Sequence, residues 1–173
     1  EFISVQNLLN EVDKDPIRFM MLNRSNDVEL DFDFDKVKVK TKDNPVFYVQ
    51  YAHARINSLL RTLNTNLSKK VELQETKFNP NEMEEKILRK VFEWPKVIES
   101  ASRKFDLHKI PFYLYELSTL FHAYWSKGNE DQKYRFIENQ KIKRNEILVT
   151  VNLVSVVIKN GMAILGVSLP EKM

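Results

Sequence analysis

The 173-residue sequence contains no cysteine, only three glycines and only three histidines. Without cysteine the chain has no disulfide framework and no thiolate metal site, which fits a protein of the cytosol. The scarcity of glycine, together with 43% hydrophobic residues, argues for an ordered, helix-rich globule rather than a disordered chain. No apolar run approaches the roughly 18 residues of a membrane span, so we expect no membrane association.

Residue types that hold metals or carry out catalysis are sparse or scattered. His53, His108 and His122 have no cluster of further ligands around them in the sequence, so no histidine metal site is expected. Acidic and apolar residues alternate over residues 30–35, and we interpret the acids as the solvated side of an extended segment rather than a cation site. The sequence has no Gly-rich phosphate loop, so we expect no catalytic residues and no cofactor in this chain.

Charge is distributed unevenly along the chain. Residues 1–44 carry 7 basic against 10 acidic side chains, whereas residues 45–173 carry 20 against 14. An acidic lead-in followed by a basic body fits nucleic-acid binding by the body.

Hydrophobic periodicity predicts an all-α fold of about four or five helices, preceded by a short helical and extended appendage. The predicted helices cover residues 4–12, 15–22, 45–67, 81–105 and 106–127. Residues 145–165 fit either a β-branched strand or a helical stripe.

Several residues define these helices in more detail. We expect Asp15 to cap the second helix, Pro95 to kink or break the fourth, and Gly128 to end the fifth. Leu9 and Phe105 are expected on the buried faces of their helices, because each continues an apolar stripe of helical spacing.

The rest of the chain is organised around residues 44–61, which begin with the helix-start pair Asn44-Pro45. Tyr48, Tyr51 and Arg55 form a stripe beside the apolar one. They either meet an exposed RNA base on its phosphate backbone, or are half-buried core residues with Arg55 paired to an acid. The pattern by itself favours the second interpretation. The apolar stripe comprises Val49, Ala52, Ile56, Leu60 and Leu63.

Two further segments have the composition of a nucleic-acid surface. Residues 120–125 are dense in aromatic side chains, as is expected for a core edge or a base-stacking platform. Residues 129–144 mix basic residues with Tyr134 and Phe136, which is typical of a loop that follows RNA phosphates and equally of a solvated linker.

The twelve residues Asn-Pro-Val-Phe-Tyr-Val-Gln-Tyr-Ala-His-Ala-Arg, 44–55, resemble the first helix of the anticodon-binding domain of arginyl-tRNA synthetases. Residues 15–25 and 30–33 resemble the segment before that domain, and residues 159–173 resemble its closing helix and tail. The resemblance implies an anticodon-binding helical bundle over residues 44–173, with residues 145–165 as a helix. Residues 1–43 would be the C-terminal end of the class I catalytic domain and a connecting segment.

The resemblance also implies a function. The parent protein would be an arginine–tRNA ligase, which uses ATP with Mg²⁺ to attach arginine to tRNA-Arg. The motifs for that chemistry are absent from this sequence, so the chain itself is expected to recognise the tRNA anticodon loop. Its other expected partner is the catalytic domain of the same chain, in a cytoplasmic monomer. The alternative is a helical protein-interaction module that shares the fold without binding RNA.

By the same resemblance, Tyr48, Tyr51 and Trp125 would stack on bases, Arg55 would hold a phosphate or base edge, and Met173 would pack under a base. Family members read chiefly the middle cytosine of the anticodon. Trp125 stands where the family usually has Tyr and so lacks a hydroxyl, and Lys172 stands where it has Arg. The complete set of expected RNA-binding residues is Asn44, Tyr48, Tyr51, Arg55, His122, Trp125 and Met173.

Overall fold

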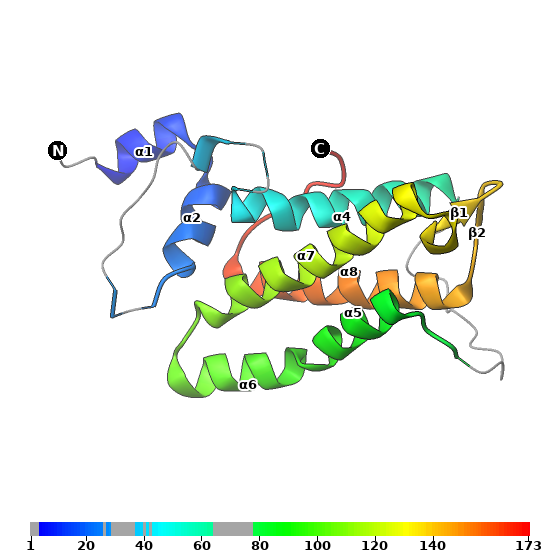
Figure 1. The fold of residues 1–173 in the computed structure, drawn as a ribbon. Helices are drawn as coiled ribbons and strands as arrows, with labels where there is room; N and C mark the ends of the chain where they lie inside the picture. The colour runs from blue at the N-terminus through cyan, green and yellow to red at the C-terminus, as the bar shows by residue number, and fades with distance from the viewer. Residues whose placement is uncertain (1–3, 26, 29–36, 40, 42, 64–77) are drawn as a thin grey trace.

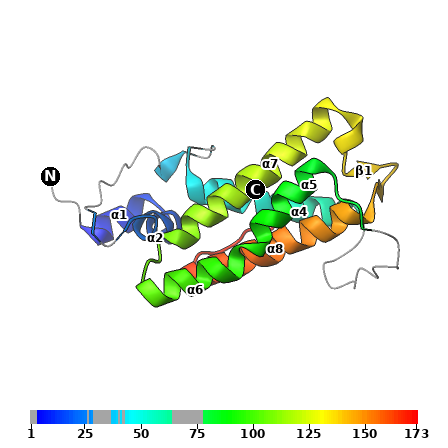
Figure 2. The ribbon, with the colours of Figure 1, turned by 60° about the horizontal axis from the view of Figure 1, so that its bottom comes forward.

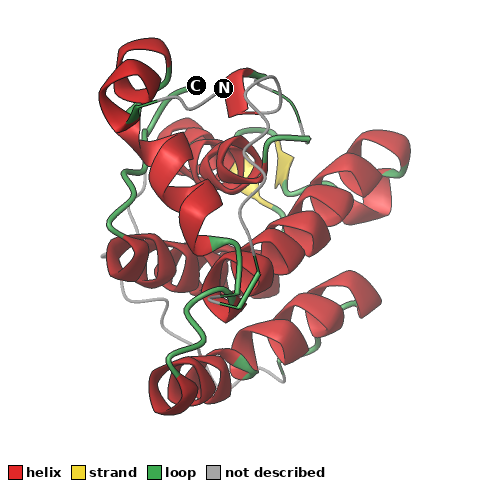
Figure 3. Ribbon diagram, turned by 90° about the vertical axis from the view of Figure 1, so that its left-hand side faces the viewer, coloured by secondary structure: helices red, strands yellow, loops and turns green. Residues whose placement is uncertain are grey.

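The computed structural model describes residues 4–25, 27, 28, 37–39, 41, 43–63 and 78–173. Within these residues the regular structure is almost entirely helical, with two short strands (Figures 1 and 3). The predicted all-α fold is confirmed. The extended segment predicted at residues 30–35 lies outside the described residues.

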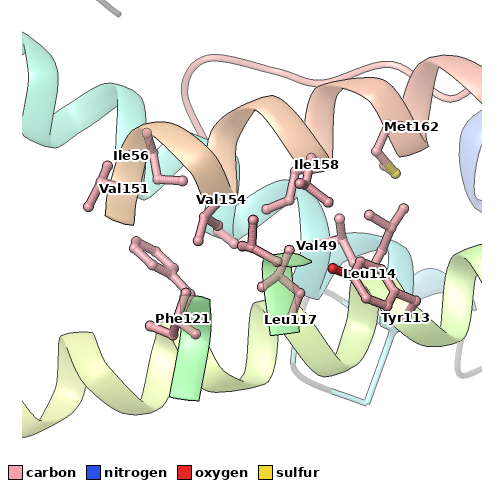
Figure 4. Packing of buried hydrophobic residues seen from close by; sticks show 14 of the residues in the cluster. Val49, Ile56, Tyr113, Leu114, Leu117, Phe121, Val151, Val154, Ile158 and Met162 are labelled. Atoms are coloured by element: carbon pink, nitrogen blue, oxygen red, sulfur yellow. The ribbon is translucent and has the colours of Figure 1, made fainter. Parts of the chain in front are cut away.

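Three long helices build the core: α4 (Pro45–Thr62), α7 (Lys109–Glu130) and α8 (Asn145–Leu165), each in contact with the other two. Their facing side chains are apolar and buried, as Figure 4 shows for Ile56, Phe121 and Ile158. Burial of this apolar surface is the main force that holds the three helices together.

The predicted apolar stripe of α4 is confirmed, since four of its members are buried and Leu63 packs against the core from the edge. The end of this helix is predicted too late. α4 ends at Thr62, and residues 64–67 of the predicted helix lie outside the described residues.

A helical pair, α5 (Glu82–Phe92) and α6 (Trp94–Lys104), packs against α7, and α5 also lies beside α8 (Figure 2). The pair is separated at Glu93, directly before Trp94-Pro95, which confirms the break predicted from Pro95. The prediction that Phe105 is buried is wrong. α6 ends one residue earlier, and Phe105 takes a left-handed conformation at φ 56° with 78% of its surface exposed.

The segment between α7 and α8 folds back onto the core as a short helix, η1 (Gln132–Tyr134), and a hairpin of β1 (Ile137–Glu138) and β2 (Lys141–Ile142). Tyr134 and Phe136 are buried in the core, so they do not alternate with the basic residues on a surface. Gly128 lies inside α7 rather than at its end. A Cβ atom there would lie 2.9 Å from the Tyr134 carbonyl oxygen, so this glycine permits the close return of the chain.

α8 is helical throughout, as the resemblance implied. By length and composition alone it is apolar enough to cross a membrane, with a mean hydropathy of 1.8, contrary to our expectation. The helix contains no long unbroken apolar run, because Thr150, Asn152 and Ser155 interrupt its apolar residues. Half of this window is buried inside the protein, where α8 packs against α4, α5 and α7 as a core helix.

The appendage consists of α1 (Val5–Glu11) and α2 (Lys14–Leu22), and α2 packs against α4 and α8. The predicted buried face of α1 is partly wrong, because Leu9 is exposed. A small apolar cluster apart from the main core contains Leu8, Val12, Ile17 and Val37.

Polar contacts of Asp15 and Arg18 join the appendage to the residues at the end of α8 and just after it. Asp15 does not cap α2, because Asp13 occupies that position. Asp15 is instead buried, and its Oδ2 accepts a hydrogen bond from the backbone N–H of Ser168 at 3.1 Å. Arg18 donates from Nε to the carbonyl oxygen of Leu165, the last residue of α8.

Candidate nucleic-acid interface

Asn44 stands directly before α4 and uses its side chain within the protein. Its Oδ1 accepts from the backbone N–H of Phe47 at 3.5 Å, and its Nδ2 donates to the carbonyls of Val37 and Val39 at 2.8 Å and 3.0 Å. The residue is buried. These bonds fix the start of α4 against the preceding segment, as is typical of a helix cap.

Tyr48, Tyr51 and Arg55 emerge from α4 beside its buried face, and all three are half-buried. The guanidinium carbon of Arg55 lies 4.4 Å from the ring centroid of Tyr51 and 5.5 Å from that of Trp125 on α7. This is the geometry of a cation–π contact. Among the described residues no carboxylate pairs with Arg55, so the alternative of an acid partner is not found.

His122 of α7 fixes the position of the Arg55 guanidinium. The Nδ1 atom of its ring lies 2.9 Å from Nη1 of Arg55, and its Nε2 atom lies 3.0 Å from the carbonyl oxygen of Tyr48. A carbonyl oxygen can only accept, so Nε2 carries the hydrogen and Nδ1 accepts from the arginine. Burial lowers the pKa of His122 to about 4, and the nearby charge of Arg55 acts in the same direction.

Aromatic rings pack closely around this histidine. The ring of Tyr48 lies 4.4 Å from that of His122 and 5.2 Å from that of Tyr115, between centroids. Tyr51 stacks at 5.6 Å on His122 and at 5.9 Å on Phe47. Burial raises the pKa of Tyr48, so its phenol stays neutral. Such packing holds the tyrosines in fixed orientations on the surface of α4.

Two hollows open over this surface, with volumes of about 570 Å³ and 450 Å³, and both are lined by Tyr51, Arg55 and Met173. The first also reaches Tyr48 and His122, and the second is completed by a group that comprises Trp125, Arg61 and Lys172. None of the described residues that line either hollow is acidic. The two hollows together, which we call the α4–α7 groove, therefore present aromatic faces and positive charge.

Comparison with known proteins bears on what this groove does. A family profile described as "DALR anticodon binding domain" matches residues 49–173, which is most of the chain. The chain belongs to this family.

The curated relatives of this DALR domain are arginine–tRNA ligases. An arginine–tRNA ligase from Pelagibacter ubique (strain HTCC1062) is 53% identical over 173 residues, which cover the whole of this chain and 30% of that protein. The chain therefore spans about a third of the length of the curated relatives that it matches.

Two solved structures share the fold of the DALR domain. A Campylobacter jejuni crystal structure assigned to an arginyl-tRNA synthetase matches with a TM-score of 0.83 and 25% identity, over 100% of this chain and 36% of that one. Arginyl-tRNA synthetase from Plasmodium falciparum matches with a TM-score of 0.71 over 99% of this chain and 29% of that one. At 22% identity the second likeness shows the fold alone.

The DALR domain brings together six of the seven residues expected to bind RNA, while the seventh, Asn44, lies buried at the start of α4. Sequence reasoning missed Arg61 and Phe47, which also line the groove. Arg61 follows Arg55 on the same helix, and a search for a second cation near the tyrosine stripe would have found it. Phe47 has no such signal, since an aromatic residue in the first turn of a helix is equally typical of a core residue.

Proposed function

We propose that this chain is the tRNA-binding part of an arginine–tRNA ligase and that the α4–α7 groove receives an unstacked base of the anticodon loop. The observation that carries the proposal is the environment of the Arg55 guanidinium. It lies over the ring of Tyr51 and is hydrogen-bonded to His122, and among the described residues it has no acidic partner. A fixed cation between aromatic faces suits a splayed base and its phosphate.

The groove offers a chemical basis for reading the base. A base can lie against Trp125, which is half-buried and lines the groove, beside the Tyr51 ring that Arg55 covers. His122 uses only one N–H of the Arg55 guanidinium, so most of its donors remain for a base edge or a phosphate. The middle cytosine of the anticodon presents O2 and N3 as acceptors, which match those donors.

Other residues in and beside the groove have supporting places in this proposal. Met173 lines both hollows and would pack against the bound base. Arg61 and Lys172 would attract the phosphate backbone. Asn44 would act by holding the first turn of α4, since its amide already bonds to the protein.

The chemistry of the parent enzyme belongs to the part of the relatives that this chain does not span. ATP with Mg²⁺ and arginine would bind there, and residues 1–43 would connect that catalytic domain to the DALR domain. The relatives are arginine–tRNA ligases, and we propose a cytoplasmic, monomeric enzyme.

The test is binding of the 173-residue chain to a tRNA-Arg transcript, with the middle cytosine intact or replaced, at two salt concentrations. We expect affinity that falls steeply with salt, because phosphate contacts release counterions. It should fall further when the cytosine is replaced. Salt-sensitive binding that ignores the base would contradict anticodon reading and indicate a generic basic surface. No binding to RNA would contradict the proposal and leave the protein-interaction module.

A further inference from the structure

The last seven residues described, 167–173, leave α8 in a fixed direction. Gly166 ends α8 at φ 66°, and the backbone N–H of Val167 donates to the carbonyl of Met162 at 3.0 Å, which closes the helix. A Cβ atom on Gly166 would lie 2.8 Å from Nε of Arg18. The turn therefore sends the chain toward α4, where Figure 1 shows the C-terminal end.

Along α4 this segment is held by side chains that donate to its backbone carbonyls. Gln50 donates to Ser168 at 2.9 Å, and Arg61 donates to Glu171 at 3.1 Å. Between them His53 lies 3.2 Å from the carbonyl oxygen of Pro170. Residues 50, 53 and 61 project from one side of α4, because an α-helix has about 3.6 residues per turn.

Of these three residues, His53 is the most buried. The residue is only 3% exposed, and its Nδ1 must carry the hydrogen, because the Pro170 carbonyl can only accept. Nδ2 of Asn57 lies 3.2 Å from both ring nitrogens of His53, and of the two only Nε2 is free to accept from that amide. Burial lowers the pKa of His53, so the ring is neutral and keeps this arrangement near neutral pH.

The segment crosses from this side of α4 to the side that carries the groove. Ala54 lies on α4 between the two sides and is only 6% exposed, and it lines the same hollow as Lys172 and Met173. The segment whose carbonyls contact Gln50, His53 and Arg61 thus leads to Met173, which forms part of the wall of the groove.

We infer that Gln50, His53 and Arg61 are positioning residues that hold the C-terminal segment on α4 and thereby place Met173 in the groove before RNA binds. The inference rests on the proposed function for its effect on RNA, whereas the placement of Met173 can be measured without RNA. A segment already ordered in the free protein loses less conformational freedom when RNA binds, which strengthens binding.

The experiment compares wild type with His53→Ala, His53→Asn, Gln50→Ala, Met173→Ala and the double variant His53→Ala/Met173→Ala. Without RNA, the NMR signal of the Met173 methyl group, identified by its loss in Met173→Ala, reports the placement. We expect His53→Ala to move this signal toward the position of an unstructured methionine. His53→Asn should restore it, because the asparagine amide can donate from about the place of Nδ1. If His53→Ala does not fold, Gln50→Ala provides the same measurement at a less buried contact.

The second readout is affinity for the anticodon stem-loop of tRNA-Arg. Loss of one such hydrogen bond should lower affinity about five-fold in His53→Ala. The double variant should bind no more weakly than Met173→Ala alone, since both changes remove the same contribution. An unmoved methyl signal in both His53→Ala and Gln50→Ala would overturn the inference while leaving anticodon reading intact. A moved signal without RNA binding by wild type would instead contradict the proposed function.

Discussion

Nη1 of Arg55 donates to Nδ1 of His122 at 2.9 Å, and this bond joins the two helices whose surfaces form the groove. The other ring nitrogen of His122 donates to the Tyr48 carbonyl at 3.0 Å, about two turns before Arg55 on the same helix. The histidine thus holds both the backbone and the cation of α4. In the proposed function His122 would therefore orient Arg55, and it would need no direct contact with RNA to do so.

Replacement of His122 should weaken RNA binding through Arg55. In His122→Phe the guanidinium loses its acceptor and the Tyr48 carbonyl loses its donor, and we expect affinity for the anticodon stem-loop to fall about ten-fold. His122→Asn keeps an acceptor oxygen near the place of Nδ1 and should bind more tightly than His122→Phe. Equal loss in both variants, or no loss in either, would contradict the positioning role. Affinity is measured at fixed salt and pH, after matched folding is checked by circular dichroism.

Protonation of His122 should destabilise the fold at mildly acidic pH. Its pKa is about 4 in the folded protein against an ordinary value of 6.5, so the unfolded chain binds more protons between these values. The free energy of unfolding therefore falls as pH drops below 6.5, by about 2 kcal/mol between pH 7 and pH 5 from this group. Urea unfolding at both pH values measures the loss. His122→Asn should lose about 2 kcal/mol less than wild type over the same interval, and an equal loss would contradict the assignment.

Much of the helical framework follows from local sequence. The apolar stripe of α4 and the break at Pro95 depend on neighbours within a few turns, and both predictions are confirmed. Errors arise where a distant segment decides the outcome. Gly128 is expected from its residue type to end α7, yet the helix continues to Glu130, and the backbone of Tyr134 returns close to the glycine. Asp15 has the position of a cap, yet it bonds to Ser168, far along the chain.

The candidate site also combines features that local sequence predicts with contacts that it does not. The stripe that contains Tyr51 and Arg55 is visible in the sequence because its members share one helix. The contact between Arg55 and His122 joins residues 67 positions apart, and that between His53 and Pro170 joins residues 117 apart. No periodicity encodes such pairs. The family resemblance grouped Arg55 with His122 among the expected RNA-binding residues, but it did not predict their hydrogen bond and gave no link between His53 and Pro170.

The buried carboxylate of Glu84 should make its partner Arg144 important for stability. Glu84 is fully buried and accepts hydrogen bonds from Tyr124 at 2.6 Å and from the backbone of Asn81 at 2.7 Å, in addition to its ion pair with Arg144. Arg144→Ala leaves this carboxylate without its cation, and we expect a loss of about 2 kcal/mol, below the full value for a buried pair because the arginine is partly exposed.

An exposed ion pair provides the control for Arg144→Ala. Arg89 and Glu85 stand 3.9 Å apart on the surface of α5, so Arg89→Ala should change the free energy of unfolding by less than about 0.5 kcal/mol. Chemical denaturation of both variants measures the difference. Similar small losses in both would show that Tyr124 and the backbone suffice to hold the Glu84 carboxylate.

Gly161 should be intolerant of even a methyl group, because the side chain of Leu114 on α7 packs directly against it. A Cβ atom at this position would lie 2.7 Å from Cδ2 and 2.8 Å from Cδ1 of Leu114, whose side chain is fully buried. Alanine favours a helix over glycine by about 1 kcal/mol, but overpacking in a core costs about 1–3 kcal/mol. Because Leu114 is fully buried in the core, we expect Gly161→Ala to lower the free energy of unfolding by about 1 kcal/mol.

Two further variants separate packing from helix propensity at this contact. Asn160→Ala changes the neighbouring exposed position of α8 and should be neutral or slightly stabilising, since only propensity acts there. Leu114→Ala should destabilise the wild type by about 2–5 kcal/mol but the Gly161→Ala background by less, because the added methyl fills part of the cavity. Urea unfolding of the four combinations gives the coupling free energy directly. A Gly161→Ala variant that is more stable than wild type, or a coupling of zero, would show that the two helices have room to separate at this point.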